Sequence, residues 1–288
     1  MRTVLLTLVA MLAFAANSLL CRLALQHASI DPASFGSVRL VSGALMLALI
    51  VRVRSGHPLA AAPDWLAATM LFAYVAFFSF AYLTLSAGTG ALLLFGAVQV
   101  TMFSAGLRAG EAFRPLAWAG LLLAIAGLVY LVSPGLAAPS PLGATLMITA
   151  GVAWGVYSLR GRRAGEPLAA TAGNFLRAAP MALALSALLA RDAHASAAGL
   201  ALAVASGAVT SGIGYVVWYA ALAGLTAMRA ATVQLSVPPI AAFGGVLLLA
   251  EPISLRLGVA SAAILGGIAI VLASRSHAAP VRPLSSGR

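Results

Sequence analysis

The chain has 288 residues, of which 62% are hydrophobic and only 8% charged, and its formal net charge is +11. Soluble domains are roughly 45–50% apolar and about 25% charged, so this composition excludes a water-soluble globule, a disordered chain and nucleic-acid binding as a main role. The single cysteine excludes an internal disulfide. A bilayer-spanning helix needs about 20 apolar residues, so the length leaves room for about ten such helices.

Ten apolar segments separated by short polar gaps follow one another along the chain. We therefore expect an all-α membrane protein with ten transmembrane helices. The first segment resembles a signal peptide, but its match to an internal segment, given below, favours a retained span. Residues 275–288 contain Pro280 and Pro283 and are expected to form a disordered cytoplasmic tail. The expected spans are residues 3–21, 33–51, 65–85, 90–107, 115–132, 142–159, 169–189, 199–222, 229–249 and 257–273.

Every basic residue is an arginine, and the arginines are unevenly placed. With the N-terminus inside the cell, twelve arginines lie in cytoplasmic segments and three, Arg22, Arg191 and Arg256, lie on the other side. Cytoplasmic loops collect positive charge, so both termini are expected in the cytoplasm. The absence of lysine excludes an ATP-binding P-loop. No histidines have the spacing of metal ligands, so we expect neither a metal nor another cofactor.

The two halves of the chain carry matching residues in the same order and at nearly constant separation. Two copies of a five-helix unit, residues 1–135 and 136–274, explain this order. Because five is odd, the second copy enters the membrane from the opposite face, and such inverted repeats are the architecture of alternating-access carriers. The matching pairs are Phe14 and Trp154, Arg39 and Arg177, Tyr82 and Tyr219, and Glu111 and Glu251.

Several of these positions resemble the EamA repeat of the drug/metabolite transporter superfamily. The similar features are the aromatic–small pairs Phe14–Ala15 and Trp154–Gly155, the Tyr-x-x-Leu motifs at Tyr82 and Tyr219, Pro238, and the glutamates Glu111 and Glu251. The resemblance covers residues 3–273 in two copies. It implies a bacterial inner-membrane exporter of small metabolites such as amino acids, with a cavity lined by spans one, three, four, six, eight and nine.

The two copies differ at one position of this pattern. Pro238 and Pro239 precede Glu251 in the second copy, whereas the first copy has Val98 and Gln99 at the equivalent place before Glu111. The two half-sites are therefore chemically unequal, and which half supplies the gate is left open. The prolines remove backbone donors in mid-membrane, and a gating bend and a static kink are weighed equally.

Amides and aromatic rings inside the spans are the candidate substrate-binding groups. An unpaired amide in an apolar environment costs roughly 2–7 kcal/mol, so each amide must face another helix or a wet cavity, and we weigh these two roles about equally. Tyr74 and Tyr215 also offer flat faces with polar tips. The residues chosen as substrate-binding are Phe14, Asn17, Tyr82, Gln99, Trp154, Tyr157, Trp218, Tyr219 and Gln234.

Charged residues near the spans are assigned structural or gating roles. Arg39 and Arg177 lie inside spans, and because each is close to a helix start, snorkelling and anchoring are favoured over recognition of a substrate carboxylate. Glu111 and Glu251 are interpreted as turn and capping residues at the membrane edges. Gly151 and Gly155 form a small-xxx-small step that lets helices approach closely.

The positions of the acidic residues bear on energy coupling. All six fall at span ends or in loops, so the sequence favours an exporter or exchanger driven by the gradient of the solute itself over a proton-coupled one. The expected partners are a small-molecule solute and the lipid bilayer, without ATP or nucleic acid, and the oligomeric state is left open. The alternatives are a carrier of the same fold for cationic drugs or lipid-linked sugars and, least favoured, an intramembrane enzyme, since no histidine lies in a span.

Overall fold

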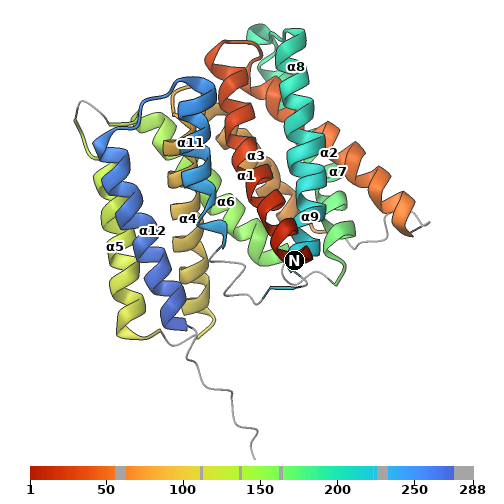
Figure 1. Cartoon of the computed structure of the whole chain (residues 1–288). Helices are drawn as coiled ribbons and strands as arrows, with labels where there is room; N and C mark the ends of the chain where they lie inside the picture. The colour runs from red at the N-terminus through yellow and green to blue at the C-terminus, as the bar shows by residue number, and fades with distance from the viewer. Residues whose placement is uncertain are drawn as a thin grey trace, which may run out of the picture.

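The computed structural model describes residues 1–55, 63–110, 113–135, 138–161, 165–222, 224–225 and 233–275. Within these ranges the chain is built of helices and loops, with an isolated antiparallel bridge between Ile30 and Ala195 (Figure 1). The first half contains α1 (Arg2–Gln26), α2 (Pro32–Ser55), α3 (Trp65–Ala81), α4 (Ala87–Arg108) and α5 (Pro115–Val132). The second half contains α6 (Pro141–Gly161), α7 (Pro167–Leu188), η1 (Ala190–Asp192), α8 (Ala197–Val204), η2 (Ala205–Ile213), α9 (Gly214–Leu222), α11 (Val237–Leu249) and α12 (Leu255–Arg275).

The number of spans agrees with the sequence prediction. Eight helical stretches are long and apolar enough to cross a membrane, with α8, η2 and α9 forming one of them. The two shorter apolar helices are α3 and α11. The protein is therefore an all-α, multi-pass membrane protein. The predicted tail, 275–288, lies outside the described residues except for the backbone of its first residue.

Two predicted spans have a different backbone from the one expected. The ninth, 229–249, is interrupted, because residues 235–236 form a turn and α11 begins at Val237. Pro238 and Pro239 stand in the first turn of α11, where a backbone N–H has no intrahelical acceptor and its loss costs nothing. The break in the span thus lies directly before the prolines, and their role as a gating bend or a static kink stays a prediction. The third span ends at Ala81 and not at residue 85.

The packing of the helices follows the repeat. In the first half α3 packs against α6, and correspondingly α8 and α9 pack against α1. Likewise α4 packs against α6, and α11 against α1. Three contacts pair a helix with its own counterpart: α2 with α7, α4 with α11, and α5 with α12. Reciprocal pairs of this kind are what a two-fold relation between the halves requires.

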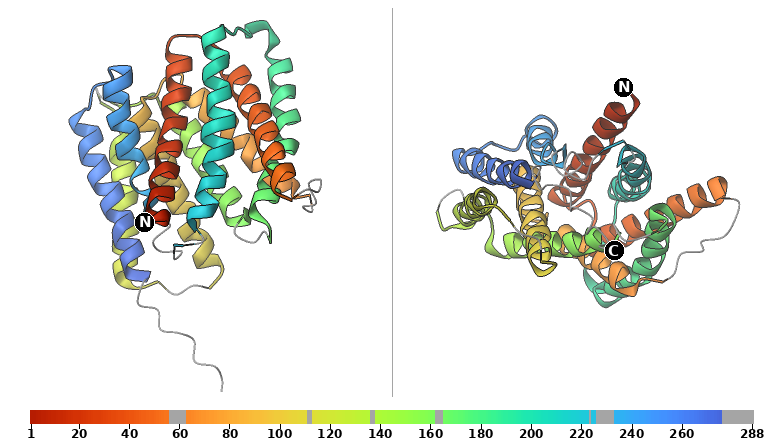
Figure 2. Two further views of the ribbon diagram at one scale, coloured as in Figure 1. Left: turned by 45° about the vertical axis from the view of Figure 1, so that its right-hand side comes forward. Right: turned by 90° about the horizontal axis from the view of Figure 1, so that it is seen from below.

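The two halves run in opposite directions. In Figure 1, α1 begins at the lower end of the bundle, whereas α6 follows α5 from the upper end. Figure 2 shows α5 beside α12 at one edge and α2 beside α7 at the opposite edge. The bundle is thus built from two inverted five-helix repeats. We call the end at which α1 begins the near end and the end at which it finishes the far end.

Glycines allow α6 to lie close to α4, as the small-xxx-small step predicted. A Cβ atom placed on Gly151 would lie 2.6 Å from the carbonyl oxygen of Leu94 and 2.7 Å from the Cβ atom of Ala97. A Cβ atom on Gly155 would lie 2.9 Å from the Cβ atom of Thr101. Such distances leave no room for a side chain, so the prediction of close helix approach is confirmed.

Replacing Gly151 with valine is expected to destabilise the bundle by about 2 kcal/mol, the usual cost of overpacking a well-packed site. The melting temperature of the detergent-purified variant should fall below that of the wild type. Gly266→Val is the matched control, because no atom lies within 4 Å of a Cβ placed at this position of α12. Equal melting temperatures for the two variants would contradict the prediction.

Candidate functional site

A small cavity of about 20 Å³, with room for about one water molecule, lies in the middle of the bundle, where the two repeats meet. Small-molecule sites usually measure about 300–1,000 Å³, so the walls of this cavity must move apart to admit a solute. The lining comes from α1, α3, α4, α6 and α9 and from the residues just before α11, which are the six spans that the family resemblance implies. The lining residues are Phe14, Asn17, Ser18, Tyr74, Phe78, Leu94, Phe95, Trp154, Tyr215 and Gln234.

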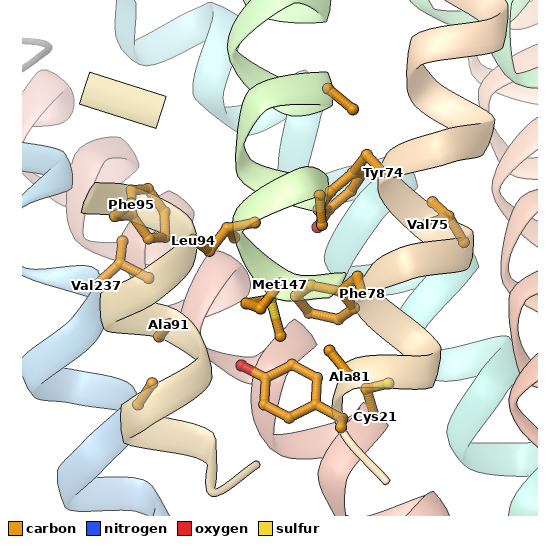
Figure 3. Packing of buried hydrophobic residues seen from close by; sticks show 14 of the residues in the cluster. Cys21, Tyr74, Val75, Phe78, Ala81, Ala91, Leu94, Phe95, Met147 and Val237 are labelled. Carbon is orange, nitrogen blue, oxygen red and sulfur yellow. The ribbon is translucent and has the colours of Figure 1, made fainter. Parts of the chain in front are cut away.

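Aromatic rings dominate this lining, and Trp154 is their centre. Its ring centroid lies 4.8 Å from that of Tyr74, 5.4 Å from that of Tyr157 and 5.6 Å from that of Tyr215. The ring of Phe14 approaches Tyr215 edge-on at 6.0 Å. Figure 3 shows Tyr74 and Phe78 of α3 on one side and Leu94 and Phe95 of α4 on the other, with Met147 between them. The cavity therefore offers flat apolar faces from both repeats.

Four of the residues predicted to bind substrate line the cavity. They are Phe14, Asn17, Trp154 and Gln234. Trp218 and Tyr157 do not line it but support it, since their rings contact Phe14 at 5.7 Å and Trp154 at 5.4 Å.

The other three predicted residues lie away from the lining. Tyr219 shares a hydrogen bond of 3.0 Å with Thr171 on α7. Tyr82 is fully buried, and its hydroxyl donates to the carbonyl oxygen of Ala87. Gln99 is half-buried on α4 and is not among the lining residues.

The sequence contained a signal for the lining residues that were not chosen. Tyr74, Phe78 and Tyr82 are spaced one helical turn apart, and their rings contact one another in that order, tilted at 5.3 Å and edge-on at 4.7 Å between centroids. Residues at this spacing share one helix face, so the periodicity indicates a continuous aromatic face. Tyr215 and Tyr219 repeat the spacing on α9.

Behind the cavity wall, Asn17 joins α1 to η2. Its side-chain oxygen accepts hydrogen bonds from Ser206 at 2.8 Å and Thr210 at 2.6 Å, and more weakly from Ser211 at 3.4 Å. The segment η2 is a π-helix of nine residues, a rare conformation that is frequent at functional sites. Asn17 thus holds a helix in place and also lines the cavity, while its binding of a substrate stays a prediction.

Arg39 of α2 is completely buried, with 1% of its surface exposed. Its Nε donates to Ser211 at 3.2 Å and its Nη2 to the hydroxyl of Tyr74 at 3.1 Å. The guanidinium carbon lies 5.2 Å from the ring centroid of Tyr74 and 5.1 Å from that of Phe78. The snorkelling predicted for Arg39 is therefore wrong, because the side chain stays inside the bundle and packs on the rings of the cavity wall.

Arg177, the counterpart of Arg39 in the second repeat, is placed differently. It is half-buried, and its Nη1 lies over Gly173, 2.7 Å from the position that a Cβ there would occupy. Among the described residues the ion pairs are Arg22 with Glu251 and Arg160 with Asp64, so neither intramembrane arginine pairs with a carboxylate there. The two arginines are equivalent in sequence but not in environment.

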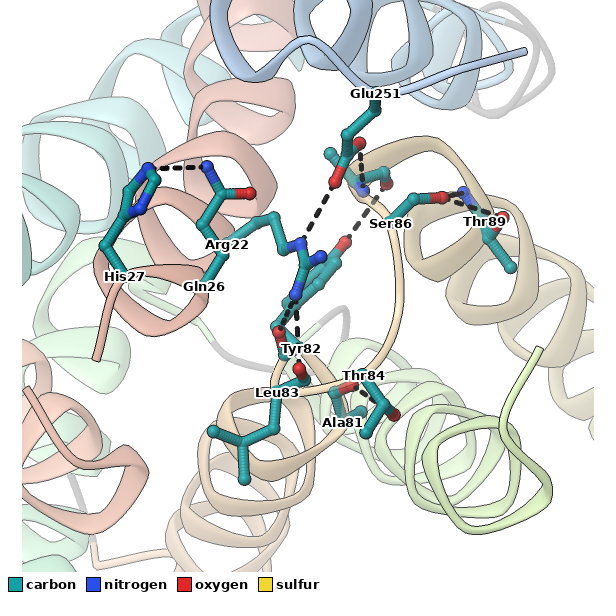
Figure 4. Close-up of polar contacts among 11 residues, drawn as sticks. Arg22, Gln26, His27, Ala81, Tyr82, Leu83, Thr84, Ser86, Thr89 and Glu251 are labelled. Atoms are coloured by element: carbon teal, nitrogen blue, oxygen red, sulfur yellow. Dashed lines mark hydrogen bonds and ion pairs between the residues drawn. The ribbon is translucent and has the colours of Figure 1, made fainter. Parts of the chain in front are cut away.

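Glu251 and Arg22 together join segments at the far end (Figure 4). Oε1 of Glu251 forms an ion pair of 3.0 Å with Nε of Arg22, at the end of α1. Its Oε2 accepts from the backbone N–H of Ala87, the first residue of α4, at 2.8 Å. Arg22 also donates to the carbonyl oxygens of Tyr82 and Leu83. We call this group the far-end clamp; Glu111, its counterpart in the sequence, lies outside the described residues.

A second seam at the far end joins the α1–α2 loop to the loop before α8. Ser196 donates its backbone N–H to Ser29 at 2.7 Å, and Asp31 and His194 exchange backbone and side-chain bonds of 3.0 and 3.1 Å. Partial burial disfavours the charged form of Asp31, but hydrogen bonds from Ser34 and His194 outweigh it and hold the pKa of Asp31 below its ordinary value. The far end is therefore fastened at two places.

Comparison with known proteins agrees with the architecture. The model of the EamA-like transporter family matches residues 1–133 and 141–273, which is once per repeat and nearly the whole chain. The chain belongs to the EamA-like transporter family. This EamA-like transporter is 55% identical to the uncharacterised protein PA1977 of Pseudomonas aeruginosa over 278 residues, which cover 95% of this chain and 96% of that protein. A solved crystal structure with 21% identity aligns with a TM-score of 0.67 over 95% of this chain and 98% of that one, and so shares its fold.

The carboxylates that the structure of the EamA-like transporter describes lie at the ends of the bundle. Those of Asp31 and Glu251 belong to the far-end contacts, and Asp64 forms an ion pair of 2.7 Å with Arg160 at the near end. Desolvation disfavours the charged form of Asp64, but hydrogen bonds from Arg160 and the backbone of Ala67 lower its pKa overall. Glu166 and Asp192 are exposed. No acidic residue is therefore among the described residues that line the cavity.

Proposed function

We propose that this EamA-like transporter is an alternating-access carrier that exports small amphipathic metabolites, with amino acids and related compounds as the first class. The observation that carries the proposal is the aromatic cavity between two inverted repeats. Flat apolar faces from Trp154, Tyr74 and Phe14 suit an organic solute better than an inorganic ion, and amides and hydroxyls in the wall add a few directional contacts.

The proposal includes the orientation and boundaries predicted from the sequence. The repeats are residues 1–135 and 136–274, the protein resides in the bacterial inner membrane, and both termini face the cytoplasm. The near end, which carries Arg2, Arg52, Arg54, Arg108 and Arg160, is then cytoplasmic. The far end, fastened by the clamp and the Asp31 seam, is then the outer end. The solute and the bilayer are the proposed partners, and the carrier is neither ATP-driven nor an enzyme.

Transport is proposed to follow the gradient of the solute, because no titratable carboxylate lines the described cavity. The test is flux of a panel of radiolabelled amino acids in proteoliposomes, with and without an imposed pH difference. We expect counterflow of at least one solute at the same rate in both conditions. Empty liposomes and liposomes with heat-denatured protein are the controls. Flux that requires the pH difference would remove the energy-coupling part of the proposal, and no flux of any solute would remove the carrier.

Cationic drugs fit this cavity less well than neutral or anionic solutes. The positively charged Arg39 packs directly behind Tyr74 and Phe78, and no carboxylate in the described lining offsets its charge. A like charge brought close to a buried charge is repelled strongly where the local dielectric is low. The alternative of cationic cargo is therefore not favoured.

A further inference from the structure

Arg39 carries a buried charge that the described part of the protein leaves without a counter-ion. Its contacts are with hydroxyls and rings, and the ionisable groups that act on it are the side chains of Tyr74, Tyr215 and Cys21. Phenols and thiols are not anions at neutral pH. Buried charges in proteins are normally paired, and an intramembrane ionisable residue usually marks a substrate or ion pathway. Arg39 therefore needs an anion from outside the described residues.

One nitrogen of the Arg39 guanidinium is an unpaired hydrogen-bond donor within the part of the chain that the structure describes. Its Nη1 is buried and has no hydrogen-bond partner among the described residues. Nearly all buried polar groups are hydrogen-bonded, so such an atom indicates a missing ligand or water. The orphaned nitrogen belongs to the group whose Nη2 already binds Tyr74, which places it next to the cavity wall.

Tyr74 connects Arg39 to the cavity. Its hydroxyl accepts a hydrogen bond from Nη2 of Arg39, and its side chain lines the cavity. A hydroxyl that accepts from a cation is polarised and becomes a stronger donor. The proton of Tyr74 is thus available to an acceptor in the cavity, and the charge of Arg39 strengthens that bond.

The repeat explains how one arginine acquires both partners. The sequence interval between Tyr74 and Ser211 equals the interval between Tyr82 and Tyr219. The equivalent positions of the third and eighth spans therefore both bind Arg39, one from each repeat. Arg177 has neither contact among those the structure describes. The positive charge of Arg39 therefore has no equivalent from Arg177 in the second repeat.

We infer that the cavity recognises the carboxylate of its solute through the hydroxyl of Tyr74. Arg39 is the positioning residue, because its positive charge strengthens this hydrogen bond. The inference rests on the proposed carrier function and assigns the cargo to one chemical class, a small monocarboxylate or zwitterion with an apolar or aromatic body. The body lies against Trp154 and Phe14, and the carboxylate accepts from the hydroxyl of Tyr74. When the rings of the wall part, Nη1 of Arg39 can supply the second donor to the same carboxylate.

Matched probes test this inference on the purified full-length protein. The probes are 3-phenylpropionate, L-phenylalanine and L-leucine, each compared with its carboxamide, which keeps the body and removes the negative charge. Affinity is read from the concentration that gives half of the maximal thermal shift. We expect at least one carboxylate to bind about thirtyfold more tightly than its amide, the range for a hydrogen bond to a charged group. Equal or tighter binding of the amides would overturn the inference.

Variants separate recognition from a merely structural role. Arg39→Gln should reduce the preference for carboxylate over amide to below about twofold, whereas Arg39→Lys keeps the charge but loses the planar set of donors and should retain part of the preference. Tyr74→Phe removes one hydroxyl and leaves the ring, so it tests the inference even if Arg39→Gln fails to fold. Arg177→Gln is the matched control and should leave the preference unchanged. An intact preference in both Arg39→Gln and Tyr74→Phe would contradict the inference.

The same probes distinguish this inference from the carrier function on which it rests. Counterflow in proteoliposomes is measured with each carboxylate and each amide. Flux of amides or amines without flux of carboxylates overturns the carboxylate assignment and leaves the carrier intact. Absence of both binding and flux for every carboxylate overturns the assignment as well.

Discussion

Glu251→Gln is expected to loosen the far end of the bundle and expose the buried thiol of Cys21. The substitution keeps an acceptor for the N–H of Ala87 but removes the ion pair with Arg22, whose two side chains are only 19% and 11% exposed. A hydrogen bond to a charged group contributes about 1.5–3 kcal/mol. A loss of about 2 kcal/mol raises the population of open molecules about thirtyfold.

Cys21 reports this opening without any engineered label. It is the single cysteine of the chain, it is 0% exposed, and it lies on α1 next to Arg22. We therefore expect the rate of maleimide labelling of Cys21 to rise about thirtyfold in Glu251→Gln, in proportion to the open population. Figure 3 places Cys21 near Phe78 and Ala81, on the far-end side of the cavity. Labelling thus reports on the path between the clamp and the cavity.

A matched ion pair at the near end provides the control. Arg160 and Asp64 form a bond of 2.7 Å, but their side chains are 43% and 31% exposed, and exposed pairs contribute only about 0–1 kcal/mol. Asp64→Asn should therefore leave the labelling of Cys21 close to the wild-type rate. A double-mutant cycle with Arg22→Gln should show that the effects of Arg22 and Glu251 are not additive. Additive effects, or equal labelling in Glu251→Gln and Asp64→Asn, would rule out the far-end clamp.

Much of this architecture could be predicted because it depends on quantities that the sequence states directly. A span is a run of apolar residues of fixed length, so ten runs predicted the helices. A repeat is a set of equal offsets, so Tyr82 and Tyr219 with their neighbours predicted the two halves. Close contact of α4 and α6 followed from Gly151 and Gly155, because only the absence of a side chain permits it.

The remaining features depend on packing that hydropathy does not record. Nothing in the apolar run 199–222 distinguishes the π-helical η2 from an ordinary helix. The depth of Arg39 depends on the approach of η2 to α2, which is so close that a Cβ on Gly207 would collide with the carbonyl oxygen of Arg39. The position equivalent to Gly207 in the first repeat is Met70, which has a side chain to accommodate. The repeat therefore predicted equal roles for Arg39 and Arg177, whereas the packing gives them different ones.

Trp154→Ala is expected to weaken solute recognition more than any other single change in the aromatic wall. Trp154 contacts the rings of Tyr74, Tyr157 and Tyr215 at 4.8 to 5.6 Å. An aromatic pair contributes about 0.5–1.5 kcal/mol beyond its buried area. The alanine variant loses one such contact with a flat solute, and the neighbouring rings lose their fixed arrangement. The apparent KM for export should therefore rise about 10- to 100-fold.

The measurement compares strains that express each variant from the same promoter. Tolerance of toxic amino-acid analogues and initial efflux rates should both fall in Trp154→Ala, while Trp154→Phe, which keeps a ring at this position, should recover part of the activity. Trp118→Ala is the matched control, because Trp118 is 43% exposed on α5 and contacts Phe103 away from the cavity. Membrane abundance of all variants is checked by immunoblot. Both variants lose the same side chain, so a role in the cavity predicts that efflux falls further in Trp154→Ala than in Trp118→Ala. Equal efflux in the two variants would show that the aromatic wall is not the binding site.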